Sequence, residues 1–271
     1  MDFVIFKNKY KIVIKNNFMP PKKPEVPQNH HDVICFTSQG REICIPASQI
    51  THLFKKGKTR DVSSWTIMRI MGELTMGFEF LKRFKKSVSI MGSARVGLEH
   101  GVYQEATNLG SKLAKAGFAV VTGGGPGVME AANKGAFEAG GRSVGINIRL
   151  ATEQRTNQYV NESESFTFFF TRKVMLETAS SAYVFFPGGF GTLDEFYEMV
   201  TLIQTHKIKR VPVILISRNF WQPLIDWMQE TMVQKNNAIA QADMEIFHLV
   251  DTADEAFELI KKLSKDKNLF N

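Results

Sequence analysis

The residues best suited to chemistry are glycines that follow an apolar segment. Residues 187–195 read Pro-Gly-Gly-Phe-Gly-Thr-Leu-Asp-Glu, and the apolar segment 182–186 before them is typical of a buried parallel strand. Apolar side chains then recur at helical spacing from 195 to 204. A turn between a strand end and a helix start gathers free backbone N–H groups at the positive end of the helix dipole. We therefore predict a phosphate site at Gly188, Gly189, Phe190, Gly191 and Thr192.

A second glycine-rich turn, residues 123–127, lies between an apolar segment (118–121) and a helical pattern (128–139). We expect Gly124 and Gly125 to contact a ligand as well. The turn is no dinucleotide fingerprint, because Val128 stands where the third glycine would be, and the chain has no Walker loop. One such turn often only reverses the chain, whereas two of them at strand–helix junctions favour a ligand site.

The elements that must position these turns alternate along the chain from residue 87 onward. This alternation predicts an α/β fold with a doubly wound parallel sheet, whose ligand lies at the carboxyl ends of the strands. The expected strands are 88–91, 118–121, 143–148, 182–186, 211–216 and 246–250, and the expected helices are 64–84, 103–116, 128–139, 195–204, 221–233 and 253–263.

Three motifs in order carry a family resemblance: residues 123–132, Arg172-Lys173 and residues 187–195. Together they resemble the "lonely guy" (LOG) family of cytokinin-activating phosphoribohydrolases, long labelled lysine decarboxylases. The resemblance covers Trp65 to Leu263 and is closest to the longer bacterial branch. It implies a Rossmann-like fold, a homodimer and hydrolysis of a purine nucleoside 5′-monophosphate to free base and ribose 5-phosphate, without a cofactor.

The resemblance implies that Arg172 and Glu195 are the catalytic pair. We expect Glu195 on the first turn of its helix, where a carboxylate would repel phosphate and so serves another purpose. Glycosidases use carboxylates to stabilise an oxocarbenium-like transition state, and Glu195 is suited to that role at C1′ of the ribose. Arg172 would fix the substrate and neutralise charge. A plain salt bridge between the two is the structural alternative.

Further contacts are expected around this pair. Ser93 ends the first strand of the sheet, where it donates to the ligand or caps the following loop. The resemblance places Glu153 near the base and Thr201 at another ligand contact. This chain has Phe170-Thr171 before Arg172 where shorter relatives carry Met-His-Gln, so both a cytokinin-type base and AMP stay open. The remaining expected contacts within the motifs are Lys173, Leu193 and Asp194.

Charge and composition restrict the other functions. Residues 1–86 carry a balance of +9 and the rest −2, so the basic surplus is outside the predicted catalytic region. We favour a solvated basic face over contact with nucleic acid or lipid, since no nucleic-acid motif accompanies it. No apolar run reaches the ~18 residues of a membrane span, and Lys7 and Lys9 interrupt the apolar start. These observations favour a cytoplasmic protein.

Residues 1–60 are predicted to be an N-terminal extension with short hairpins and a proline-rich linker, and residues 61–271 the hydrolase domain. Cys35 and Cys44 could face each other across a hairpin, and we favour two buried free thiols in a reducing cytosol. The six histidines lack metal-ligand spacing, so we predict no catalytic metal. Two rival classes remain. One is a nucleotide-binding regulator or carrier without hydrolase activity. The other is a pyridoxal-phosphate decarboxylase, for which Lys173 is the only lysine in the motifs.

Overall fold

The computed structural model describes residues 64–149 and 156–264, together with the backbone of four short strands nearer the N-terminus. The chain divides into two compact units, Met1–Val62 and Ser63–Asn271. In the first unit, β1 (Val4–Lys7) pairs antiparallel with β2 (Tyr10–Val13), and β3 (Val33–Ser38) with β4 (Arg41–Pro46). The second pairing sets Cys35 opposite Cys44, as the hairpin predicted. The predicted proline-rich linker lies outside the described residues.

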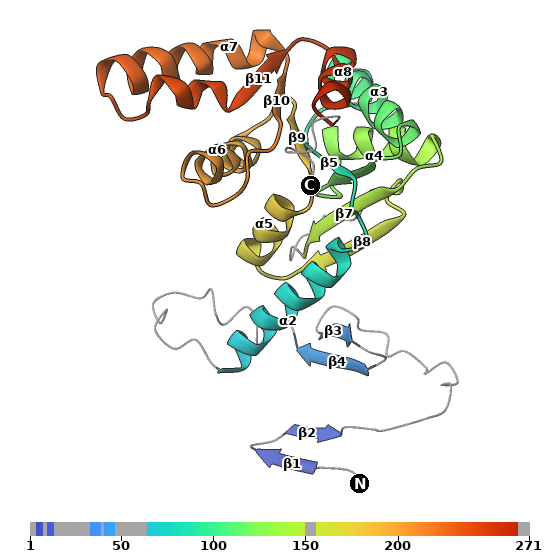
Figure 1. Cartoon of the computed structure of the whole chain (residues 1–271). Coiled ribbons are helices and arrows are strands. Elements are labelled where there is room, and N and C mark those ends of the chain that lie inside the picture. The colour runs from blue at the N-terminus through green and yellow to red at the C-terminus, as the bar shows by residue number, and fades with distance from the viewer. Residues whose placement is uncertain are drawn as a thin grey trace. The chain divides into compact units, whose positions relative to one another are not determined.

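The second unit is built on a seven-stranded, all-parallel sheet, so the prediction of a doubly wound α/β fold is confirmed (Figure 1). The strand order is β11-β10-β9-β5-β6-β7-β8. Interior strands are buried on both faces, which is why they are continuous apolar runs in the sequence. The strands are β5 (Ser87–Met91), β6 (Ala119–Thr122), β7 (Ser143–Ile148), β8 (Glu162–Phe166), β9 (Ala182–Phe185), β10 (Val213–Ile216) and β11 (Phe247–Val250).

Helices cover both faces of the sheet (Figure 1). One core cluster joins the sheet to α3 (Gly101–Lys115), α4 (Val128–Glu138) and α8 (Ala253–Leu263). The other joins it to α2 (Ser64–Leu81), α5 (Phe169–Thr178), α6 (Phe190–Gln204) and α7 (Arg218–Trp227). The expected helix 221–233 is in fact α7 followed by a π-helix, Met228–Lys235. Among the described residues, no helix has the length and apolar character that a membrane crossing needs.

The start of α6 corrects one expectation about the site. The helix begins at Phe190, directly after Gly189, so Glu195 lies on its second turn and not on its first. Packing explains the early start, because Thr192 and Phe196 lie one turn apart and are both buried. A Cβ on Gly188 would lie 2.1 Å from Thr192 Oγ1, so the turn needs glycine where it closes against the helix.

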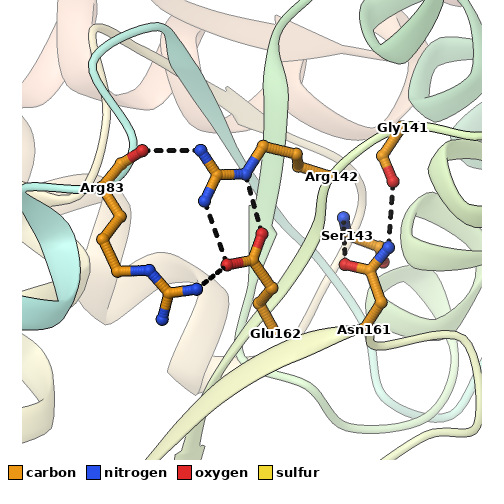
Figure 2. Close-up of polar contacts among 6 residues, drawn as sticks. All are labelled: Arg83, Gly141, Arg142, Ser143, Asn161 and Glu162. Atoms are coloured by element: carbon orange, nitrogen blue, oxygen red, sulfur yellow. Dashed lines mark hydrogen bonds and ion pairs between the residues drawn. The ribbon is translucent and has the colours of Figure 1, made fainter.

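The edge of the sheet at β8 is fastened by a network of charges (Figure 2). Arg142 donates from Nε to Glu162 Oε1 (2.7 Å) and from Nη2 to Oε2 (3.0 Å), and its Nη1 donates to the Arg83 carbonyl (2.6 Å). Arg83 also pairs with Glu162, and the two arginines hold the pKa of this carboxyl below its ordinary value. Because Arg83 follows α2, the network ties the end of that helix to β7 and β8.

Candidate active site

The predicted motifs meet where the strand order of the sheet reverses, between β5 and β9. Ligands of open α/β sheets bind at the carboxyl ends of the strands at such a point. Ser93, just after β5, donates its N–H to the Pro187 carbonyl (3.0 Å) and accepts from the N–H of Val128 (3.0 Å). Its backbone therefore joins both glycine-rich turns. Its hydroxyl accepts from the N–H of Arg95 (3.1 Å), which is the loop-capping role among the two expected for it.

The turn after β6 is held by close contacts and side-chain amides. Gly124 and Gly127 both have φ of +71°, a conformation that favours glycine. A Cβ on Gly124 would lie 1.8 Å from the Asn147 side-chain oxygen. Asn157 donates its backbone N–H to the Gly124 carbonyl (2.9 Å) and its side-chain amide to the Gly125 carbonyl (3.0 Å). The turn is therefore fixed before any ligand binds.

A buried amide that the sequence analysis missed supports the same turn from beneath. Asn133 on α4 is fully buried, and its Oδ1 accepts from Thr122 Oγ1 (2.6 Å) and from Asn157 Nδ2 (3.0 Å). Its Nδ2 donates to Ser143 Oγ (2.9 Å). The available signal was an asparagine on the small apolar face of this helix, since a buried amide needs several partners.

Arg172 lies between the end of β7 and the turn after β6. Its Nε donates to the Ile146 carbonyl (2.9 Å), and a Cβ on Gly123 would lie 2.3 Å from its Nη2. The guanidinium therefore rests against the backbone of Gly123. Burial lowers the pKa of Arg172, and the nearby Glu195 carboxyl opposes that shift. The structure thus brings the two predicted catalytic residues into electrostatic contact.

Glu195 projects from α6 into the same region and is largely buried. Burial raises its pKa to about 7, while Lys173 and Arg172 lower it and Asp194 and Glu177 raise it. Near neutral pH the carboxyl group is therefore about half ionised. Among the described ion pairs there is none between Arg172 and Glu195, so the plain salt bridge is not observed. A perturbed carboxyl in such a place is typical of functional sites.

Lys173 is surrounded by carboxylates. Its ammonium donates to Asp194 Oδ2 (2.5 Å) and also pairs with Glu198. The predicted substrate contacts Lys173 and Asp194 are thus engaged with each other. An ion-paired ammonium is not the neutral amine that forms a Schiff base, which disfavours the decarboxylase interpretation.

Three carboxylates of this cluster approach closely. Oxygens of Glu177, Glu195 and Glu198 lie within 4.8 Å of one another, a spacing that could hold a metal ion, and no histidine takes part. Lys173 already supplies a positive charge to Glu198 in this group. The absence of a catalytic metal remains a prediction.

The other predicted residues have varied surroundings. Phe190 is 92% exposed, at the open end of the turn, whereas Leu193 packs against the core. Thr201 is exposed and donates its hydroxyl to the Tyr197 carbonyl (2.7 Å) within its own helix. Glu153 lies outside the described residues.

The doubly wound parallel sheet defines a Rossmann-like α/β protein, and sequence comparison relates the chain to one family of such proteins. Residues 129–260 match the family described as possible lysine decarboxylase. The chain is 26% identical over 185 residues to the cytokinin riboside 5′-monophosphate phosphoribohydrolase LOG of Oryza sativa subsp. japonica, covering 68% of this chain and 74% of that protein. It is 27% identical over 188 residues to LOG1 of Arabidopsis thaliana, covering 68% and 85%. The resemblance to the LOG family is confirmed.

Solved structures agree at the level of the fold. The molybdenum cofactor binding protein from Rippkaea orientalis is 20% identical, with a TM-score of 0.52, over 66% of this chain and 97% of that one. At this identity the likeness concerns the arrangement of helices and strands alone.

Proposed function

We propose that this protein is a cytoplasmic nucleoside 5′-monophosphate phosphoribohydrolase. Its substrate would be a purine nucleotide, with AMP and cytokinin-type nucleotides as the two candidates. The observation that carries the proposal is the placement of Glu195, a largely buried carboxyl with a pKa of about 7, beside Arg172, whose guanidinium rests against the glycine-rich turn at Gly123. The names of the curated relatives give the reaction class.

In the proposed reaction the 5′-phosphate binds at the N-terminus of α6, where no side chain caps the first turn and the leading backbone N–H groups of the helix favour an anion. The C1′–N9 bond breaks and positive charge develops at C1′. The Glu195 carboxylate stabilises that charge and orients the attacking water, whose oxygen bonds to C1′. The water loses one proton as its oxygen bonds to C1′, the base leaves with one proton, and ribose 5-phosphate remains, so the two proton transfers balance.

Arg172 contributes a cation whose position is set by the protein. Its Nε is engaged by the Ile146 carbonyl and its Nη2 rests against Gly123, so the guanidinium has little freedom. A cation fixed in this way neutralises negative charge on the bound nucleotide without reorganisation during the reaction. It also favours the ionised form of Glu195.

We infer that the enzyme acts as a homodimer. Large apolar side chains remain exposed on α2 and at the start of α5 within the described part of the chain, which is the kind of surface that a partner covers. They are Trp65, Ile67, Met68, Met71, Phe78, Phe169 and Phe170.

The decisive experiment is incubation of the purified protein with a panel of nucleoside 5′-monophosphates and the matching nucleosides, followed by chromatographic separation of the products. Release of a purine base and ribose 5-phosphate, with much weaker activity on nucleosides, is expected because phosphate binding positions C1′. Binding of nucleotides without base release would favour the regulator or carrier instead. Equal turnover of nucleoside and nucleotide would contradict the phosphate site.

A further inference from the structure

Glu73 is a buried acid on α2 that none of the motifs includes. It is 1% exposed, and its carboxylate reaches the chain just before α5. Oε1 accepts from the N–H of Thr167 (2.8 Å), and Oε2 accepts from the N–H of Phe168 (3.3 Å) and from the Thr171 hydroxyl (2.6 Å). Because α5 begins at Phe169, these contacts cap its N-terminus from another helix.

The start of α5 needs such a cap. Phe168 is the N-cap residue and has no side-chain cap, and the first turn holds no acid. Near this turn the helix carries two cations, Arg172 and Lys173. Cations are unfavourable at the positive end of a helix dipole, whereas a carboxylate there is stabilising. Glu73 supplies the negative charge that the local sequence of α5 lacks.

The position of α2 is itself fixed. Gly77 lies one turn after Glu73 on the same face, and a Cβ there would lie 2.3 Å from Met175 Sδ of α5. Arg69, one turn before Glu73, lies with its guanidinium 5.4 Å from the Phe168 ring centre. Beyond the C-terminal end of the helix, Arg83 joins the network of Arg142 and Glu162 (Figure 2). The carboxylate is thus presented by a helix that cannot easily shift.

We propose that Glu73 is a positioning residue: by capping α5 it sets the position of Arg172, and with it Lys173, relative to Glu195. Glu73 contacts Thr171, whose side chain is fully buried. Thr171 directly precedes Arg172, so the contact with Glu73 reaches Arg172 through the backbone of α5. The helix before the sheet is then part of the active-site framework. The effect on turnover rests on the proposed function, and the effect on α5 does not.

The first test compares Glu73→Gln with Glu79→Gln. Glu79 is on the same helix, its side chain is 64% exposed, and it pairs with Lys82 at the surface. Three quantities are measured for each variant: the rate of amide hydrogen exchange over residues 167–172, and kcat and KM with AMP. Glu73→Gln should speed exchange and lower kcat about 10- to 100-fold, because small displacements of a catalytic group are costly. Glu79→Gln should change neither, and an unchanged Glu73→Gln variant would overturn the proposal.

A double-mutant cycle with Arg172→Lys separates positioning from general loss of stability. If Glu73 acts through Arg172, Glu73→Gln should cost much less in the Arg172→Lys background than in the native one. Equal losses in both backgrounds would overturn the positioning role. Should Glu73→Gln fail to fold, Thr171→Val removes one partner of the same carboxylate and is expected to act in the same direction.

Failure of the two proposals is distinguishable. If the native protein releases no base from any nucleotide, the proposed function fails. The exchange measurement on residues 167–172 then still tests whether Glu73 holds α5.

Discussion

Arg172 and Gly123 are so close that a Cβ on the glycine would lie 2.3 Å from the arginine Nη2. The Nε of the same guanidinium donates to the Ile146 carbonyl (2.9 Å), so the group cannot simply move away. Gly123, in the turn after β6, therefore leaves the space that the guanidinium occupies. This role does not depend on whether the turn also contacts a phosphate.

Gly123→Ala should consequently displace Arg172 and lower kcat/KM with AMP about 100-fold while the protein stays folded. Gly72→Ala is the matched control, since a Cβ on this α2 residue meets nothing within 4 Å. The control should keep its activity and gain slightly in stability, because alanine favours a helix more than glycine does. Base-release kinetics and thermal unfolding measure both effects. Full activity of Gly123→Ala would show that Arg172 tolerates displacement.

The fold could be predicted from the sequence because six of the seven strands of the sheet show apolar character that reveals them. The strand β8, Glu-Ser-Glu-Ser-Phe, was missed because it lies at the edge of the sheet and all its side chains except Phe166 are polar. The start of α6 was predicted too late in the chain because Gly191 favours a turn. In the structure, burial of Thr192 and Phe196 outweighs that preference.

The site was only partly predictable. Arg172 and Glu195 came from a family resemblance, since residues on different helices leave no spacing pattern. The pairing of Lys173 with Asp194 and Glu198 depends on the packing of α5 against α6, which no local signal gives. Glu73 stands among the apolar residues of α2, and no local pattern in the sequence predicts that its carboxylate is buried against the start of α5.

Activity should rise with pH through about 7. Glu195 stabilises a developing cation only when it is ionised, and burial raises its pKa to about 7. We expect kcat/KM with AMP to increase between pH 6 and pH 8. The second ionisation of the substrate phosphate, at pH ~6, falls at the lower end of this range. A profile that is flat across this range would exclude Glu195 as the ionising group.

Lys173→Met should move this profile to higher pH. Lys173 lowers the pKa of Glu195, so its removal lets burial and the neighbouring carboxylates raise that pKa further. Lys261→Met, which removes a surface lysine paired with Glu258, is the matched control and should leave the midpoint in place. The pH dependence of kcat/KM for both variants is the measurement. A midpoint that falls in Lys173→Met would contradict the electrostatic account.

Glu195→Gln should lose turnover and gain stability. The variant keeps the shape of the side chain and removes its charge, so kcat should fall about 100-fold or more. The folded-state pKa of about 7 exceeds the ordinary value of 4.5. The folded protein therefore binds more protons than the unfolded chain in this window, and its stability falls as pH rises through it.

Because glutamine mimics the neutral acid, Glu195→Gln should exceed the native protein in free energy of unfolding by about 3 kcal/mol at pH 8. Below about pH 4, where the carboxyl group is neutral in both the folded and the unfolded chain, the two should agree. Denaturant unfolding at both pH values measures the difference. A variant less stable than the native protein at pH 8 would show that the ionised carboxylate is well accommodated, contrary to its raised pKa.

A shortened chain that begins at Asp61 should remain dimeric and keep its kcat, because the motifs, Glu73 and the exposed apolar residues of α2 all lie beyond that point. A chain that begins at Lys86 also lacks α2, and it should lose the cap of α5 and most of its activity. Light scattering and base-release assays on the two chains distinguish the contributions. An active monomer from Asp61 would contradict the dimer, and a folded but inactive dimer would assign residues 1–60 a part in catalysis. Full activity of the chain from Lys86 would show that Arg172 needs neither Glu73 nor a partner bound through α2.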